Sequence, residues 1–593
     1  MERVSTEQEY AVAVIGAGPR GTSFLERLLA HVERSSPGAR RKLRVLVFDP
    51  AAHGPGRVWD PGQSRLYLMN TPAAYPTAAP TGPTQDQLPA SSCSLSYLEY
   101  CRTHSRGDGA EAYPARSDYG AYLAWLSKEA SALLRGRGVA VEHISAQITG
   151  LQQDGGQYSL LASGAEYTAD AVILAVGHLE TEPAAGPSHL ADQADQLGLD
   201  YQPPAIPTDV DYQRFGAGEN VLVRGMGLNF FDLMIQVTAG RGGRFRVDHS
   251  AEPGHRCSYV RSGNEPQLIA GSRRGTPYRA KTVAPGFVPQ GIELVHLSEE
   301  ALGRLVAENR MLDFSADLWP LITKDVAATY AQFGGAGEFD ILSYARPFQN
   351  RHWTSPEQHQ QTMIAWLEDD AAASAAGAGS AEKMAVNALH AARLRVKELV
   401  TENLISPESL LRDVEGWFEA LVEGLASGPP LQRIEELAAL ARAGVVEFLG
   451  PEPVYGVDVA DRSFIADAAA VQGARYHAAH MIEAMMPPNR VTQARSPMIR
   501  GLLETGLAVP AHIEADGKNH VHKGFAVTEQ PHRLVDSQGA AGRIYVLGLQ
   551  LSSAQWGTAI AAEAGGDHRG TARTLADADA AAADIMAAAG INS

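Results

Sequence analysis

Three glycines near the N-terminus are spaced as in loops that bind the pyrophosphate of a dinucleotide. Gly16, Gly18 and Gly21 form a GxGxxG motif that also contains Pro19 and Arg20. The first glycine permits a tight turn, the second lets the backbone approach the pyrophosphate, and the third lets the following helix pack close to the strand. The free amide groups at the start of that helix can bind the anion. The motif predicts a dinucleotide site, although by itself it also fits a tight turn without a ligand.

The segments around this motif supply the strands and helix that such a site requires. Apolar Tyr10–Ile15 precedes the glycines, a helical pattern follows over Thr22–His31, and a second apolar run covers Leu43–Phe48. This βαβ unit is the context in which the motif becomes informative. Asp49 ends the second strand, where a carboxylate can accept ribose hydroxyls, at a longer separation from the glycines than usual.

A second strand, turn and helix begin at residue 220. Asn220–Arg224 is apolar and strand-like, Gly225 and Gly227 form the turn, and Leu228–Thr238 has a helical pattern. Phe230 occupies the place of a third glycine, so the match is poorer than the first. The pattern predicts a second Rossmann-type unit, with a structural turn as the alternative.

Two arginines follow the next predicted strand of this second unit. Leu268–Gly271 is strand-like and leads into Ser272, Arg273 and Arg274. An acid at this position would accept the ribose 2′-hydroxyl of NADH, whereas arginines favour the 2′-phosphate of NADPH. Two solvated surface arginines are the alternative reading.

Composition limits the class of protein. A chain of 593 residues is too long for one hydrophobic core, so two to four domains are expected. Lys and Arg total 50 against 68 Asp and Glu, and the formal charge of −18 argues against nucleic acid and anionic membrane as partners. The apolar runs are too short for a membrane span. The polar N-terminus lacks the pattern of a signal peptide, and three cysteines without zinc-type spacing fit a reducing cytoplasm and predict no metal site.

Several motifs together resemble the bacterial FAD/NAD(P)-binding flavoprotein monooxygenase family. The family includes N-oxygenases of natural-product pathways that convert aspartate to nitrosuccinate. The segments that carry the resemblance are Gly16–Gly21, Phe48–Pro50 with Gly54–Trp59, Val176–His178, Ser272–Gly275, and Tyr545–Gly548 with Trp556–Thr558.

The resemblance implies particular cofactor positions. For FAD they are Gly16, Gly18, Pro19, Arg20, Gly21, Asp49, Arg57, Asn70, Gly177, Gly548, Trp556 and Thr558, and for NADPH they are Gly225, Gly227, Ser272, Arg273 and Arg274.

The expected fold is α/β, with two Rossmann-like dinucleotide-binding domains and a largely helical insertion. We expect the first part of a discontinuous FAD domain over residues 1–215, an inserted NADPH domain over 216–296, a helical insertion over 297–450 that serves as substrate lid or interface, and a return over 451–593 ending in a helix. The Ala- and Gly-rich residues 371–379 are expected to form a flexible loop within the insertion.

A flavin beside NADPH permits several reactions. Cys93 and Cys101 do not form a CxxC pair, which disfavours a dithiol reductase. A dehydrogenase or reductase, a C- or S-oxygenating enzyme and a redox-sensing binding protein stay open. The resemblance favours an N-monooxygenase of a small amino acid, with L-aspartate and O2 as substrates and a flavin C4a-hydroperoxide as the oxygen donor. No catalytic residue is assigned, because His178, His352 and His480 are candidates by residue type alone.

A dicarboxylic amino acid should be held by arginines that pair with its carboxylates. One candidate group is Arg346 and Arg351 with His352; the other is Arg490 and Arg495, near Arg500. Surface ion pairs are the alternative for both groups. The sequence leaves open whether the chain forms a homo-oligomer.

Overall fold

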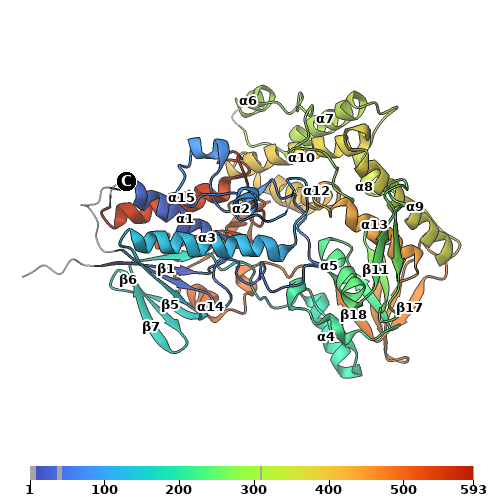
Figure 1. The fold of residues 1–593 in the computed structure, drawn as a ribbon, viewed down its shortest axis with the longest axis horizontal. Coiled ribbons are helices and arrows are strands. Elements are labelled where there is room, and N and C mark those ends of the chain that lie inside the picture. The colour runs from blue at the N-terminus through green and yellow to red at the C-terminus, as the bar shows by residue number, and fades with distance from the viewer. Residues whose placement is uncertain (1–8, 36–42, 108, 308–309, 592–593) are drawn as a thin grey trace, which may run out of the picture. The chain divides into compact units, whose positions relative to one another are not determined.

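The computed structural model describes residues 9–35, 43–107, 109–307 and 310–591 in two compact units. Unit 1 comprises residues 1–182, 397–403 and 488–593, and unit 2 comprises residues 183–396 and 404–487. Figure 1 shows the elements of each unit.

Unit 1 is built on a six-stranded sheet in the order β21-β22-β8-β1-β2-β4. Its strands are β1 (Tyr10–Ile15), β2 (Leu43–Phe48), β4 (Ala140–Ile144), β8 (Ala171–Leu174), β21 (Arg533–Val535) and β22 (Ala541–Val546). All neighbours pair in parallel except β21 and β22. The chain therefore returns to this sheet from near its C-terminus, as the discontinuous FAD domain predicted.

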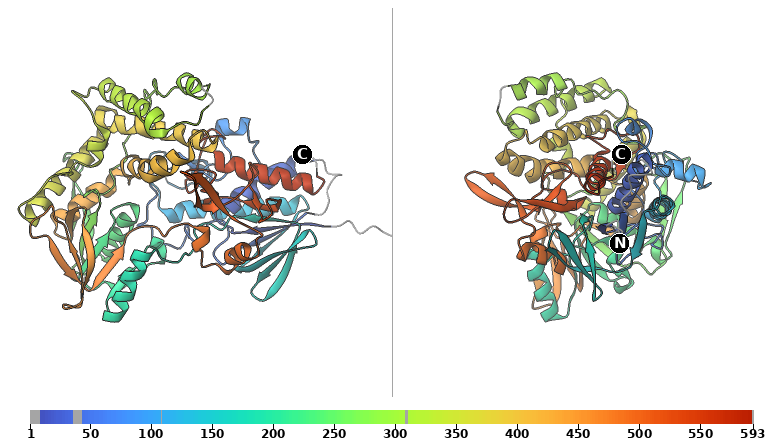
Figure 2. Two further views of the ribbon diagram at one scale, coloured as in Figure 1. Left: turned by 180° about the vertical axis from the view of Figure 1, so that it is seen from behind. Right: turned by 90° about the vertical axis from the view of Figure 1, so that its left-hand side faces the viewer.

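Helices pack around this sheet and its neighbouring strands. They are α1 (Pro19–Arg34), α2 (Tyr97–Thr103), α3 (Arg116–Gly136), α14 (Pro497–Glu504) and α15 (Arg573–Ala588). The first and last of these, α1 and α15, lie side by side (Figures 1 and 2). Unit 1 also contains a meander of β5 (Ile148–Asp154), β6 (Gln157–Ala162) and β7 (Ala165–Ala169), the hairpin of β19 (Pro510–Ala515) and β20 (Lys518–Phe525), and the short pair of β3 (Pro76–Thr77) and β23 (Ala562–Glu563).

Burial explains why β1 and β2 read as continuous apolar runs. Val12, Ala13 and Val14 have no exposed surface, although their side chains alternate between the two faces of the sheet. A parallel strand covered on both faces needs apolar residues at every position. This is why both strands begin and end at the residues that the sequence predicts.

Unit 2 has a five-stranded, entirely parallel sheet in the order β14-β13-β10-β18-β9. Its strands are β9 (Asp200–Gln202), β10 (Asn220–Arg224), β13 (Gln267–Ser272), β14 (Val446–Pro451) and β18 (His480–Glu483). The predicted strand 220–224 is the central one, and α5 (Leu228–Val237) follows its glycine turn.

The other elements of unit 2 are mostly helical. They are α4 (Ala185–Leu197), α6 (Glu299–Ala307), α7 (Trp319–Gln332), α8 (Ile341–Ala345), α9 (Pro356–Ala375), α10 (Ala381–Thr401, whose last turn belongs to unit 1), α11 (Pro407–Ser409), α12 (Glu419–Ala426) and α13 (Leu431–Arg442). Residues 410–418 form a π-helix that leads into α12. Small sheets of β11 (Arg244–Val247) with β12 (Cys257–Val260) and of β15 (Val454–Asp458), β16 (Ser463–Asp467) and β17 (Arg475–Ala478) flank them.

Most of residues 297–450 belongs to unit 2. One feature of this helical region differs from the sequence expectations. The prediction of a flexible loop at 371–379 is wrong, because α9 continues to Ala375 and a short 3-10 turn covers Gly377–Gly379. Alanine is the strongest helix former, and the carbonyl of Ser374 accepts a hydrogen bond from the Val283 amide at 3.0 Å.

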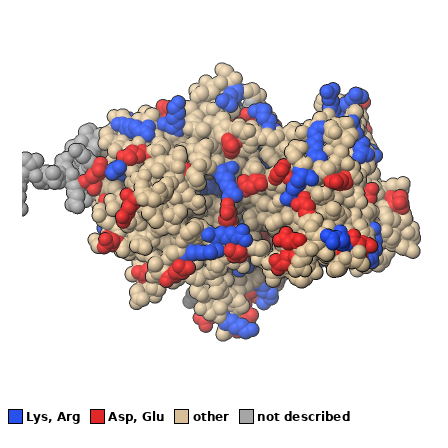
Figure 3. All heavy atoms as spheres, turned by 90° about the horizontal axis from the view of Figure 1, so that it is seen from below, with Lys and Arg blue, Asp and Glu red and all other residues tan. Residues whose placement is uncertain are grey.

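Acidic and basic side chains are mixed on the molecular face drawn in Figure 3. Among the described residues, no helix combines the length and the apolar character needed to cross a membrane.

Candidate cofactor and substrate sites

The first glycine turn lies at the carboxyl end of β1. Gly16 has a φ of +98°, and an added Cβ would lie 2.2 Å from the carbonyl oxygen of Ala175. A Cβ on Gly21 would lie 2.2 Å from the carbonyl oxygen of Gly16, whereas the nearest atom to a Cβ on Gly18 is Gly56 Cα at 3.9 Å. Packing therefore requires the first and third glycines, while the second leaves its space open for a ligand.

Asp49 organises this turn from the end of β2. Its Oδ2 accepts a hydrogen bond from the Ala17 amide at 2.7 Å, and its Oδ1 accepts one from the Ala51 amide at 2.8 Å. A carboxylate has about four acceptor positions. Asp49 can therefore hold the turn and still accept ribose hydroxyls.

Arg20 connects the first turn of α1 to the C-terminal return segment, which we define as Gly548–Ile560. Its guanidinium donates to the carbonyl oxygens of Thr558 at 3.0 Å and Ile560 at 2.7 Å. Burial lowers the pKa of Arg20 from its ordinary value. Arg20 therefore links α1 to the return segment, which follows it by more than 500 positions in the sequence.

Unpartnered polar atoms near the carboxyl edge of the sheet test whether a cofactor fits there. Gln550 donates to the carbonyl oxygen of Gly177 at 2.8 Å and to Asn489 Oδ1 at 3.3 Å, yet its own Oε1 is buried without a partner in the described part of the chain. The same holds for Ser552 Oγ and His53 Nε2. Buried polar atoms rarely stay unpaired, so these residues fit a polar ligand such as FAD.

Other predicted FAD residues lie in the same unit. Arg57 pairs with Glu180 at 3.3 Å, and burial, followed by the charge of Arg57, lowers the pKa of His178. Asn70 Oδ1 accepts a hydrogen bond from Thr71 at 3.5 Å. Trp556 is half-buried in the return segment.

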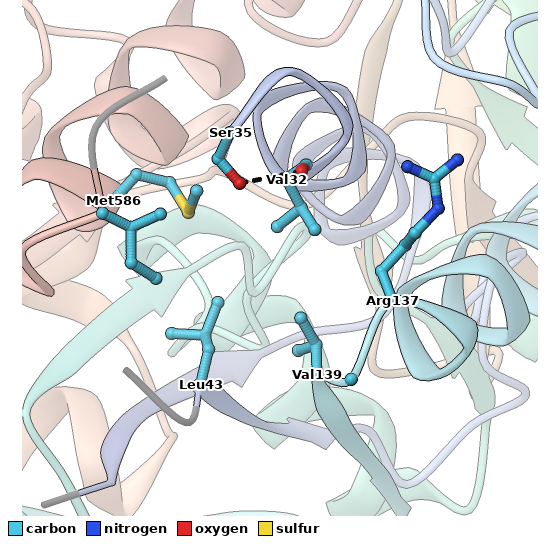
Figure 4. A pocket seen from close by; sticks show the side chains of 8 residues that line it. Val32, Ser35, Leu43, Arg137, Val139 and Met586 are labelled. Carbon is cyan, nitrogen blue, oxygen red and sulfur yellow. Dashed lines mark hydrogen bonds between the residues drawn. The ribbon is translucent and has the colours of Figure 1, made fainter. Parts of the chain in front are cut away.

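A small hollow at the opposite end of this sheet is distinct from the glycine turn (Figure 4). Val32 at the end of α1, Leu43 at the start of β2, Val139 just before β4 and Met586 on α15 line it. Ligands of open parallel sheets bind beyond the carboxyl ends of the strands. The hollow lies at the amino ends, so it is not the nucleotide site.

The second glycine turn lies at the carboxyl end of β10. Gly225 has a φ of +111°, and an added Cβ would lie 3.0 Å from the carbonyl oxygen of Ala484. A Cβ on Gly227 would lie 3.3 Å from the ring of Tyr278. Phe230, at the position of the missing third glycine, is fully buried in the core of unit 2. The turn is therefore closed by apolar packing instead of a close contact between helix and strand.

The two arginines after β13 differ in their surroundings. Arg273 is exposed, whereas Arg274 lies over the ring of Tyr278 at 5.0 Å and donates to the carbonyl oxygen of Ala420 at 3.3 Å. Ser272 donates to the carbonyl oxygen of Thr276 at 2.8 Å. Arg273 is therefore the more available of the two for a nucleotide phosphate.

A buried ion cluster fixes the loop that follows these arginines. Asp370 on α9 accepts from Arg279 at 2.8 Å, from Lys383 at 2.9 Å and from the Ala280 amide at 2.7 Å. The Lys281 amide donates to the carbonyl oxygen of Pro429 at 3.0 Å. The backbone on both sides of Lys281 is thus held by the surrounding helices.

The ammonium group of Lys281, unlike that of Lys383, has no carboxylate partner among the described residues. Burial, with the nearby charge of Arg393 second, lowers the pKa of Lys281 to about 8. Among the described residues, no carboxylate lies within ion-pair distance of its ammonium group. Desolvation of an unpaired charge is costly. A bound anion that pairs with the ammonium group of Lys281 would offset this cost.

Two side chains of α10 adjoin Lys281. Arg393 donates to Ser427 Oγ at 2.9 Å. Burial, followed by the charges of Arg393 and Lys281, lowers the pKa of His390 to about 3, and its Nδ1 is buried without a partner among the described residues. His390 is therefore neutral near pH 7 and can accept or donate one hydrogen bond to a ligand. We refer to Lys281, His390 and Arg393 as the basic cluster.

Two carboxylates on α12 accompany the basic cluster. Glu419 and Glu423 both act on the charge of Arg393. Burial, followed by the charge of Glu419, raises the pKa of Glu423, which also accepts a hydrogen bond from Tyr278 at 3.5 Å. Cationic and anionic groups therefore meet in one region of unit 2.

The substrate residues proposed from sequence lie on the surface. Arg346, Arg351 and His352 of unit 2 are exposed, and Arg351 lies about 6 Å from the rings of Phe348 and Trp353. In unit 1, Arg490 is exposed, and Arg495 and Arg500 each pair with Glu182 at 3.0 Å.

The basic cluster was missed in the sequence, although a signal exists. Lys383, His390, Arg393 and Lys397 fall on one face of an otherwise mainly apolar helix.

The surroundings of Cys93, Cys257 and His480 do not indicate a catalytic role. Burial raises the pKa values of Cys93 and Cys257 to about 12, so these thiols stay protonated. His480 contacts Asp200 at 2.8 Å and Glu219 at 2.9 Å, at the amino end of β18 and away from the glycine turn.

Two sheets of mainly parallel strands, each with a glycine turn at the carboxyl end of an inner strand, define a protein with two dinucleotide-binding folds. A family model described as FAD-NAD(P)-binding matches residues 13–179. An L-aspartate N-monooxygenase (nitrosuccinate-forming) of Streptomyces cremeus is 34% identical, over 96% of this chain and 94% of its own. The nitrosuccinic acid synthase npaA of Aspergillus oryzae is 32% identical, over 98% and 93%.

The chain belongs to this family of N-monooxygenases, and it is an FAD- and NADPH-dependent oxidoreductase. The family, the fold class and both cofactors predicted from the sequence are thereby confirmed. The L-lysine 6-monooxygenase of Pseudomonas syringae, a solved structure, is 12% identical over 98% of this chain and 99% of its own, with a TM-score of 0.42.

Proposed function

We propose that this chain oxygenates the amino nitrogen of L-aspartate and forms nitrosuccinate through the N-hydroxy amino acid. Each oxygenation would consume one NADPH and one O2. Relatives that match nearly the whole chain bear this activity in their names. The observation within this chain that carries the proposal is the uncompensated ammonium group of Lys281.

The charge pattern of aspartate complements the groups around Lys281. Its two carboxylates would pair with Lys281 and Arg393, and neutral His390 would supply a further hydrogen bond. Charge-assisted hydrogen bonds of this kind are the strongest that a protein offers to a carboxylate. Binding would also relieve the repulsion within the basic cluster.

The amino group of aspartate must lose a proton before its nitrogen can attack an oxygen donor. Glu423 and Glu419 on α12 would bind the ammonium, and Glu423, whose pKa is raised, would accept the proton. Bound FAD supplies the oxygen-transfer chemistry. The role of the protein is to place the amine, remove its proton and exclude water.

The cofactor positions remain part of the proposal. Gly18, Asp49 and the return segment would hold FAD, and Gly225 and Arg273 would hold NADPH. The surface residues Arg346, Arg351, His352, Arg490 and Arg495 stay as secondary substrate candidates. Three free, buried cysteines support the cytoplasm as the location.

Purified enzyme with FAD, NADPH and O2 tests the substrate. L-Aspartate should stimulate NADPH oxidation and give a product whose mass corresponds to nitrosuccinate. L-Asparagine, which lacks the side-chain carboxylate, and succinate, which lacks the amine, are matched controls and should give no N-oxygenated product. NADPH loss that yields only hydrogen peroxide with aspartate would overturn the proposal.

A further inference from the structure

A buried polar network joins the return segment of unit 1 to α15. His532 Nε2 lies 3.2 Å from Asp577 Oδ1 and 2.9 Å from Gln555 Nε2. The Gln555 amide also donates to Asp577 Oδ2 at 3.0 Å, and Gln530 donates to Asp577 Oδ1 at 3.1 Å. His532, Gln555 and Asp577 are each 2–3% exposed. Such a network is costly to bury and holds its members in one arrangement.

The imidazole of His532 has polar neighbours at both nitrogens. In the tautomer with its proton on Nδ1, His532 donates to the carbonyl oxygen of Thr528 at 3.3 Å and its Nε2 accepts from the Gln555 amide at 2.9 Å, so that Gln555, and not a direct hydrogen bond, links His532 to Asp577. The second amide hydrogen of Gln555 then reaches Asp577. Both hydrogens of the Gln555 side chain are thereby committed, so its position is tightly defined.

The return segment is held from two sides. Gln555 ties its middle to α15, and Arg20 ties the carbonyl oxygens of Thr558 and Ile560 to α1. The charge of Asp577 also acts on Arg20, which places the two anchors near each other. Trp556 lies between them in sequence, so its backbone has little freedom.

A second His–carboxylate pair on α15 provides an internal comparison. His31 Nε2, in the last turns of α1, lies 3.1 Å from Asp579 Oδ1, and His31 is 6% exposed. Within the part of the chain that the structure describes, His31 makes no hydrogen bond to the return segment, and its other polar neighbour is Arg34. The two pairs are similar in chemistry and burial but differ in what they hold.

We propose that His532, Gln555 and Asp577 are positioning residues that hold the return segment against bound FAD and thereby set the properties of the flavin. This proposal rests on the FAD placement proposed above. It identifies residues that do not belong to the glycine motifs and that act on the cofactor through Gln555 and its neighbours.

Holoenzyme carrying His532→Asn tests the proposal, with His31→Asn as the matched control. His532 has a φ of +60°, a conformation that asparagine tolerates well, so the substitution removes the imidazole without straining the backbone. FAD affinity, the visible absorption spectrum of the bound flavin and its midpoint potential are measured, together with the thermal midpoint.

Both variants should lose stability, but only His532→Asn should shift the flavin spectrum and potential and weaken FAD binding, by up to about tenfold for one net hydrogen bond. An unchanged flavin in His532→Asn, or equal shifts in His31→Asn, would overturn the proposal. If His532→Asn does not fold, Gln555→Met removes the amide at similar volume and is judged by the same criteria.

These measurements need no amino-acid substrate. The spectrum, potential and affinity report on His532 even if aspartate is not oxygenated. Failure of the substrate proposal is therefore distinguishable from failure of this one.

Discussion

Replacing Lys281 with methionine should stabilise the protein without substrate and weaken its response to aspartate. Methionine keeps an unbranched side chain and removes the ammonium group. Burial and Arg393 lower the pKa of Lys281 to about 8, whereas an unfolded lysine titrates near 10.4. Between these values the unfolded chain binds more protons than the folded protein, so stability rises with pH through this window.

The size of this effect follows from the difference between the two pKa values. One pKa unit corresponds to about 1.4 kcal/mol, so the charged lysine destabilises the fold by on the order of 3 kcal/mol below about pH 8. Lys281→Met should remove that penalty near neutral pH and lose the advantage above about pH 10.4. Urea unfolding at both pH values measures it.

Although Lys281→Met should stabilise the protein, it should weaken the binding of aspartate. A charge-assisted hydrogen bond contributes about 1.5–3 kcal/mol, so the KM for aspartate should rise roughly 10- to 150-fold. In the unmodified enzyme the KM should also rise above about pH 8, where Lys281 loses its proton, and this pH dependence should be absent from the variant.

Lys383→Met is the matched control, because Lys383 is more deeply buried than Lys281 but is paired with Asp370 at 2.9 Å. Its loss should destabilise the protein. A Lys281→Met enzyme that is less stable than the unmodified one near neutral pH, and that keeps its KM for aspartate, would refute the reasoning.

Three further predictions follow from the cofactor turns and the buried acid. Gly18→Ala should fold but lose FAD, which is measured as loss of the visible absorbance of the flavin. Gly21→Ala is the control and should fail to fold, because the added Cβ would collide with the backbone. A Gly18→Ala enzyme that retains FAD would contradict this prediction. Arg273→Ala should lower kcat/KM for NADPH about tenfold or more with little change for NADH, while Arg274→Ala should mainly lower the melting temperature; equal losses with both nucleotides would argue against the phosphate contact. Asp370→Asn should destabilise unit 2 by about 3–5 kcal/mol, measured by denaturant unfolding, and a change below about 1 kcal/mol would mean that its cationic partners are solvated.

The amino-acid sequence by itself determined the nucleotide-binding framework. The apolar runs Tyr10–Ile15, Leu43–Phe48 and Asn220–Arg224 coincide with β1, β2 and β10. These features are local, because a strand buried on both faces must be apolar throughout and a tight turn needs glycine wherever it occurs. The family resemblance rested on short local motifs as well, among them Gly16–Gly21 and Ser272–Gly275.

Tertiary structure decided which charged groups are compensated. Nothing local distinguishes Lys281 from Lys383, yet Asp370 neutralises only Lys383 and Arg279, and Lys281 is left beside Arg393. The same applies to the return segment, where Gln555 meets partners that precede it by 23 positions and follow it by 22. Desolvation and charge pairing depend on what surrounds a side chain in space, and residues far apart in the sequence supply those surroundings.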